Sequence, residues 1–178
     1  MKITMILSSI LLISACGGGG GSTPNNTSGN SSGATNGAVM LSGTDTSTVG
    51  TQLDTGYVAT SLAAGSQPDY IVVVDKSSTV TFTEPNILIP VTADLNNGFV
   101  LVVTDDSAGS GMKAISMSII VSGVKHDYAC TTPVTVFIEC GANSITLNIV
   151  NKTVDFDNVI VTNTDTSTVL TMDGTLTW

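Results

Sequence analysis

The chain has 178 residues, with 14 acidic side chains against 5 lysines and no arginine, and a formal net charge of −9. Nucleic-acid binding requires a basic face, so this composition excludes nucleic acid as a partner. The same charge opposes contact with anionic membrane surfaces, so attachment to a membrane would have to come from a lipid. Thr, Val and Ile are abundant, and Asp outnumbers Glu, which favours strands and turns over helices.

The first sixteen residues have the pattern of an export signal. Lys2 is followed by an apolar run, residues 3–13, which is too short to cross a bilayer of about 30 Å as a helix. The run ends in the sequence ISAC at residues 13–16, which places small residues directly before a cysteine. This segment resembles the lipobox of bacterial lipoproteins. The alternative is an ordinary secretory signal with a chance cysteine nearby.

The resemblance implies that residues 1–15 are removed and that Cys16 becomes the acylated first residue of the mature chain. Three acyl chains, palmitate among them, exceed the two signals that stable anchoring needs. In the family, an aspartate after the cysteine favours retention in the inner membrane, and here the next residue is Gly17. We therefore expect a lipoprotein of the bacterial outer membrane, facing the periplasm or the exterior, whose membrane contact is made through Cys16.

Residues 16–37 predict a flexible tether. After Cys16 the segment is rich in Gly, Ser and Asn and has no charge and no large apolar side chain, so it cannot repay the entropy of folding. A coil of this composition and length spans roughly 25 Å. Residues 38–178 are then expected to form one domain, which is long enough to bury its own core.

Short Val, Ile and Thr runs separated by turn signals predict an all-β domain, an antiparallel β-sandwich with a β-barrel-like arrangement as the alternative. In residues 114–122, large apolar side chains alternate with mostly small or polar ones, which predicts one buried and one mostly polar face. The predicted strands are 57–62, 70–74, 79–83, 87–91, 99–104, 114–122, 134–140, 145–150, 153–162 and 167–172.

A hairpin is predicted around residues 151–152. A two-residue turn there would place Ile149 opposite Val154 and Leu147 opposite Phe156, and it would sort both strands into an apolar and a polar face.

Two further features are predicted near the C-terminus. The apolar phase changes after Phe156, which predicts a bulge near residues 157–158 or a passage to a second sheet. Asp173-Gly174 predicts a type I′ turn that pairs 167–172 with 175–178 and places Trp178 in the core.

The sequence TDTSTV occurs twice, at residues 44–49 and 164–169. The separation is too long for a solenoid repeat. The repeat predicts two similar turns that lie near each other in space, unless it arises by chance in a chain rich in Thr, Asp and Ser.

Cys130 and Cys140 remain once Cys16 is assigned to the lipid. An exported protein meets an oxidising compartment, so we expect a disulfide between them, worth roughly 3 kcal/mol on chain-entropy grounds. A metal site is the weaker alternative, because two cysteines and the lone His126 lack a fourth ligand at the usual spacing.

The remaining candidates for chemistry favour structural roles. His126 is expected on the surface, at a polar strand end or turn, and residues 109–113 are expected to form a hairpin loop rather than a phosphate loop. The acidic pairs Asp105-Asp106 and Asp155/Asp157 are expected to be solvated, with no specific calcium site. No catalytic residue, cofactor or metal is predicted.

The C-terminal half, with its cysteine pair, the segment SITLNIVNKTVDFDNVIV and the ending DGTLTW, resembles the β-rich domains of uncharacterised proteobacterial lipoproteins. The resemblance implies no catalytic residue. We expect a non-enzymatic binding or structural module of the cell envelope. The alternatives are an envelope hydrolase that uses acidic residues, and a calcium-dependent adhesion or ligand-binding module.

Overall fold

The computed structural model describes residues 31–34, 37–61, 69–83, 87–106, 109–133, 138–141 and 144–178. The expected signal peptide and Cys16 lie outside these residues. The one helix in the described ranges is α1 (Thr46–Val49), and the strands there are β1 (Ser31–Ala34), β2 (Val39–Gly43), β3 (Gln52–Leu53), β4 (Thr55–Ser61), β5 (Asp69–Asp75), β6 (Thr79–Thr83), β7 (Ile87–Val91), β8 (Gly98–Asp106), β9 (Met112–Val121), β10 (Val124–Thr132), β11 (Ile145–Asn148), β12 (Thr153–Asn163) and β13 (Val169–Thr177). The predicted all-β antiparallel class is confirmed.

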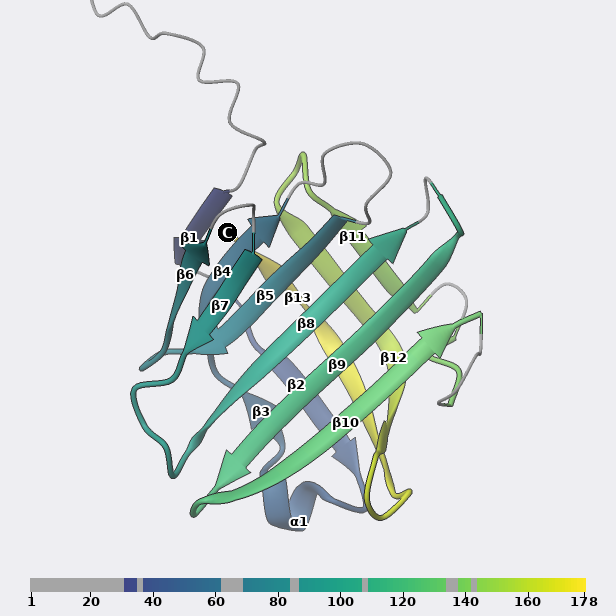
Figure 1. Ribbon diagram of the computed structural model, residues 1–178. Coiled ribbons are helices and arrows are strands. Elements are labelled where there is room, and N and C mark those ends of the chain that lie inside the picture. The colour runs from purple at the N-terminus through teal and green to yellow at the C-terminus, as the bar shows by residue number, and fades with distance from the viewer. Residues whose placement is uncertain are drawn as a thin grey trace, which may run out of the picture.

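The main sheet is nearly closed and barrel-like, which is the arrangement given as the alternative to a sandwich. Its strand order is β1-β4-β5-β8-β9-β10-β12-β13-β2-β3. β1 stands at one end of this order and pairs with β4, whereas β2 lies near the other end and pairs with β13 (Figure 1). Because β2 follows β1 in the chain, the two strands bring the ends of the sheet together. A hydrogen bond from the Thr55 hydroxyl to the Gly37 carbonyl, 2.8 Å long, joins the two ends.

β1 corrects the expected extent of the tether, because residues 31–34 pair with residues 57–60 of β4. Backbone donors and acceptors are enough to complete an open sheet edge, so such pairing does not depend on the side chains of the added strand.

A second layer covers part of the sheet from outside. The two-stranded sheet β6-β7 packs over β4 and β5, and Val80 and Leu88 contact Val72 and Val74 of β5. The other face of β5 lies in the barrel interior, where Ile71 and Val73 belong to the main core. Burial on both faces explains why β5 is a continuous apolar run rather than an alternating one.

The hairpin of β11 and β12 keeps the predicted faces but has a longer turn. Leu147 pairs with Val154 and Ile145 with Phe156, so the register differs by two residues from the one expected. A shift of two residues leaves each side chain on its own face, because strand side chains repeat every two residues. The turn therefore has four residues, 149–152, and Lys152 takes the left-handed φ of 53°. The bulge near residues 157–158 is confirmed, with a register shift between Phe156 and Val159.

The predicted turn at Asp173-Gly174 is wrong, because both residues lie inside β13, which pairs with β12 and β2. Asp173 accepts a hydrogen bond of 2.8 Å from the Asn158 amide, which the bulge leaves free of the regular ladder. Gly174 has a φ of 137°, and a Cβ there would lie 2.6 Å from the Ala38 carbonyl oxygen. The pair therefore serves a bulge and a close strand approach. Trp178 packs against the core, as expected.

The predicted disulfide between Cys130 and Cys140 is present, with a Cα–Cα distance of 5.1 Å. Both cysteines are buried, and the bond holds the segment 138–141 beside the end of β10. Two backbone hydrogen bonds of 3.3 Å support the same contact, from Thr131 to Ile138 and from Cys140 to Thr131.

Candidate functional site

A depression of about 480 Å³ lies on the outer face of β8, β9 and β10, beside the β6-β7 layer. Figure 1 shows these three strands side by side at the front of the molecule. We call this depression the β9 trough. It is lined by Val102, Thr104, Ala114, Ile115, Ser116, Ser118, Lys125, Asp127, Tyr128, Ala129, Cys130, Thr131 and Thr164.

The floor of the trough is low because the outward side chains of β9 are small. Large residues such as Ile115 and Met117 point into the core, so alternation turns Ala114, Ser116 and Ser118 outward. The register places Val102 and Ala129 on either side of Ser116. The side chains along β9 are short, and larger ones stand beside them on the neighbouring strands, Val102 and Thr104 on β8 and Asp127 and Thr131 on β10, which leaves a depression along β9.

The two walls are held by different contacts. On the β8 side, Val102 packs against the hydrophobic cluster under the β6-β7 layer. On the β10 side, the Thr164 amide donates a hydrogen bond of 2.9 Å to the Asp127 carbonyl. The trough is therefore bounded by elements from three separate parts of the chain.

One end of the trough carries an ion pair whose two charges balance each other. Lys125 lies 2.9 Å from a carboxylate oxygen of Asp127, and the Ser118 hydroxyl donates to the same carboxylate group. Partial burial raises the pKa of Asp127, but the hydrogen bonds from Ser118 and Lys125 and the positive charges of Lys125 and His126 outweigh it and hold this pKa below its usual value. Asp127 therefore stays ionised at neutral pH, and Lys125 balances its charge.

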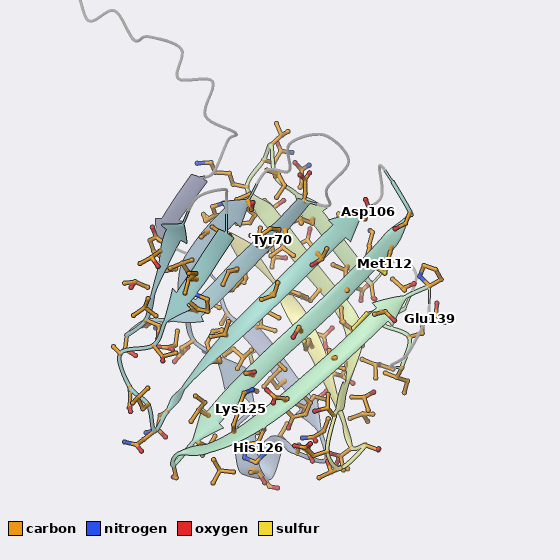
Figure 2. The ribbon with its side chains drawn as sticks, in the orientation of Figure 1. Tyr70, Asp106, Met112, Lys125, His126 and Glu139 are labelled. Carbon is orange, nitrogen blue, oxygen red and sulfur yellow. A yellow bond between two sulfur atoms is a disulfide. The ribbon has the colours of Figure 1, made fainter. Side chains whose placement is uncertain are left out.

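The sequence-predicted residues near the trough have structural positions. His126 follows Lys125 in β10, is half-buried and pairs with Ile119, on the other side of the strand from Asp127. Cys130 lies beneath the trough, where it is bonded to Cys140. Figure 2 shows Lys125 and His126 near the start of β10, at the opposite end from Asp106 and Met112.

The structure does not join the predicted acidic pair Asp105-Asp106 into one site. Asp105 lies 3.8 Å from Lys113, whereas Asp106 accepts hydrogen bonds from the amide and hydroxyl of Ser110. These latter bonds lower the pKa of Asp106. The amides of Gly109 and Gly111 donate to the Asp106 carbonyl, so the segment is a hairpin connection, as expected.

The second acidic pair is also divided between different partners. Asp155 accepts a hydrogen bond of 2.5 Å from the Thr175 hydroxyl, and Asp157 accepts one of 2.8 Å from the Asn158 side chain. Among the described residues, no group of three or more His, Cys, Asp and Glu side chains is arranged to hold a metal ion.

A polar contact that the sequence only hinted at joins the two TDTSTV segments. One carboxylate oxygen of Asp45 accepts a hydrogen bond of 2.9 Å from the Tyr128 hydroxyl and one of 2.6 Å from the Thr168 hydroxyl. The predicted proximity of the repeated segments is thereby confirmed, although the first forms α1 and the second a turn into β13. Burial raises the pKa of Tyr128 to about 12, and Asp45 acts in the same direction, while a hydrogen bond with Asn163 opposes them.

No protein-family model matches the chain, and neither the search of curated proteins nor that of solved structures finds a similar one. Along the described stretches, no helix combines the length and the apolar character that crossing a membrane requires.

Proposed function

We propose that the protein is a lipid-anchored binding module of the bacterial outer membrane, held through Cys16, and that the β9 trough is its ligand-contacting surface. The trough carries the proposal. Its volume of about 480 Å³ falls in the range of small-molecule sites, roughly 300–1,000 Å³. It is built on paired strands rather than on a loop, and such a rigid surface loses little entropy when a ligand binds.

The polar groups of the trough support binding rather than catalysis. A general acid must release a proton near the working pH, and a lowered pKa leaves Asp127 as a carboxylate that already accepts bonds from Ser118 and Lys125. Such a group can orient a ligand through its remaining lone pairs. The module is therefore proposed to act without chemical change in what it binds.

The membrane part of the proposal rests on the lipobox resemblance of residues 13–16 and is tested by fractionating cells. Cys16→Ala is expected to move the protein from the membrane to the soluble fraction, because no thiol remains to receive the lipid. Gly17→Asp is the matched control, since it keeps Cys16 and is expected to shift the protein from the outer to the inner membrane. Unchanged membrane association of Cys16→Ala would contradict the anchor.

The binding part is tested by labelling one cysteine placed in the trough. Ser116→Cys puts a thiol at the centre of the floor, and Ser42→Cys puts one at an exposed position of β2, away from the trough. We expect a maleimide to label Ser116→Cys more slowly in intact envelopes than in purified lipidated protein. Ser42→Cys should show no such protection. Equal rates for Ser116→Cys in both preparations would contradict a ligand in the trough.

A further inference from the structure

The lining of the β9 trough is dominated by hydroxyl and methyl groups. Hydroxyls come from Thr104, Ser116, Ser118, Thr131 and Thr164, and small apolar groups come from Val102, Ala114 and Ala129. A Ser or Thr hydroxyl can donate one hydrogen bond and accept others, so this surface can form hydrogen bonds with both donor and acceptor groups of a ligand.

The charge of the trough differs from that of the whole chain. Among its lining residues the charged ones are Lys125 and Asp127, which neutralise each other at 2.9 Å. An anionic polymer would be opposed by the chain's net charge of −9. A cationic one would be attracted by that charge, but within the trough it would find the carboxylate of Asp127 already paired with Lys125. These charges favour a neutral ligand.

The two strands that form the floor and the β8 side of the trough do not offer an edge for an added peptide strand. β8 and β9 are paired on both sides, whereas β10 pairs with β9 along its length and with β12 only at Tyr128 and Ala129. The neighbouring layer has an outer strand, β7, but Pro90 has no amide hydrogen and the Leu88 amide donates to the Tyr70 hydroxyl, 3.3 Å away. A ligand must therefore be recognised through side chains rather than through main-chain pairing.

The shape of the trough suits an extended ligand. From Ala114 to Ser118 the floor follows four residue steps of β9, which is about 13 Å at ~3.3 Å per residue. The hydroxyls of Thr104 and Thr131 flank this line on the two neighbouring strands, because both stand in register with Ala114.

We propose that the β9 trough binds a short stretch of a neutral, linear glycan lying along β9, an inference that rests on the proposed binding function. The glycan's hydroxyls bond to the Ser and Thr side chains of floor and walls. Its C–H faces lie on Val102, Ala114 and Ala129. The Lys125–Asp127 pair supplies charge-assisted hydrogen bonds to hydroxyls at one end.

The test uses the lipidated chain in nanodiscs, with maltohexaose, cellohexaose and chitohexaose as neutral probes. A galacturonate hexamer and a neutral Ser/Thr peptide of similar length serve as competitors, and binding is measured by calorimetry. We expect saturable binding of at least one neutral hexasaccharide that is insensitive to salt, because charges contribute little. The galacturonate and the peptide should not bind.

Two substitutions locate the binding. Ser116→Phe fills the trough at an exposed strand position and should weaken binding by at least about tenfold. Ser42→Phe, the matched control on β2, should leave it unchanged. Thr104→Val keeps the shape but removes one hydroxyl, and it should cause a smaller loss, which ties binding to the hydroxyl itself rather than to the shape of the trough.

Three results would overturn the inference: no neutral hexasaccharide binds, the peptide or the galacturonate binds in its place, or Ser116→Phe binds as well as Ser42→Phe. If the Ser116→Cys thiol is protected in envelopes while the hexasaccharides fail to bind, the trough is a binding site for another class of ligand. If that thiol is not protected either, the proposed function is wrong as well.

Discussion

The hydrogen bonds that Asp45 accepts from Tyr128 and Thr168 can be tested as an energetic link between distant parts of the chain. Tyr128 is 1% exposed, so its hydroxyl depends on protein partners rather than on bulk water. A hydrogen bond to a charged group contributes about 1.5–3 kcal/mol. Tyr128→Phe removes this bond together with the hydrogen bond to Asn163 and leaves the ring packed, so it is expected to lower the free energy of unfolding by at least that amount.

Asp45→Ala is expected to cost more, about 3 kcal/mol, because it removes both accepted bonds and leaves a buried phenol hydroxyl short of an acceptor. Asp45 precedes α1, but its side chain makes no capping hydrogen bond to the helix, so the loss comes from Tyr128 and Thr168. The matched control is Asp165→Ala, the same position in the second TDTSTV segment. Asp165 is exposed, and its loss should change stability by less than about 0.5 kcal/mol.

Urea denaturation of the two single variants and the double variant Asp45→Ala/Tyr128→Phe gives the coupling directly. We expect a coupling free energy of about 1–2 kcal/mol, because each single substitution already removes the shared bond. Strict additivity, or an Asp165→Ala cost equal to that of Asp45→Ala, would refute the reasoning.

The same hydroxyl gives a signature in alkali. The pKa of Tyr128 is raised from 10.0 to about 12, so between these values the unfolded chain releases a proton that the folded chain keeps. The contribution of Tyr128 to the free energy of unfolding is therefore fully present below pH 10, and about 2–3 kcal/mol of it is lost as the pH rises towards 12. The difference in stability between wild type and Tyr128→Phe should shrink over this interval.

Two further predictions concern single positions in turns and strands. Asp75 accepts hydrogen bonds from Ser77, Ser78 and the Phe99 amide. Partial burial raises the pKa of Asp75, but these bonds outweigh it and hold the pKa below its usual value of 3.8. The stability that Asp75 contributes is therefore present above pH 3.8 and is lost as the pH falls through the lower folded pKa. Asp75→Asn should cost about 1–3 kcal/mol at neutral pH in urea denaturation, and a cost that does not shrink in acid would contradict this. Gly174→Ala should lower the free energy of unfolding by more than about 2 kcal/mol, because a left-handed φ and a 2.6 Å approach of the new Cβ to the Ala38 carbonyl oxygen act together. Gly111→Ala should have a smaller effect, because its Cβ would have nothing within 4 Å and only its φ of 76° is unfavourable. Equal thermal melting of these two variants would show that the close approach has no energetic weight.

The inward face of the sheet could be predicted from the sequence because burial leaves a strong signal. Ile115, Met117 and Ile119 alternate with small or polar residues, and the structure buries all three. The faces of β11 and β12 were predictable for the same reason, even though the turn between them is two residues longer than expected. Alternation determines which face a residue occupies, whereas the length of the turn determines which residue it meets.

Closure of the barrel and the role of Asp173-Gly174 could not be predicted in this way. An Asp-Gly pair is a strong hairpin signal, but here the Asp serves a bulge in β12 and the Gly lets β2 come close. Both needs arise from neighbouring strands that are far away in the sequence. Local turn preference gives about 1 kcal/mol or less, and it is outweighed by the pairing of β13 with β12 along most of its length and with β2 over Leu170–Asp173.

The β9 trough lies on the outer face of the sheet, where the sequence pattern predicts exposure but not the shape of the surface. An outward row of Ala114, Ser116 and Ser118 has the composition of any solvated strand face, and its own strand gives no sign of a groove. The groove depends on the register, which sets Val102 and Thr104 along one side and Ala129 and Thr131 along the other. It also depends on the β6-β7 layer, which covers the adjoining strands and stops short of β9. A binding surface of this kind is a property of two strand pairings and one covering layer, so the residues that form it become visible as a group only when the sheet is assembled.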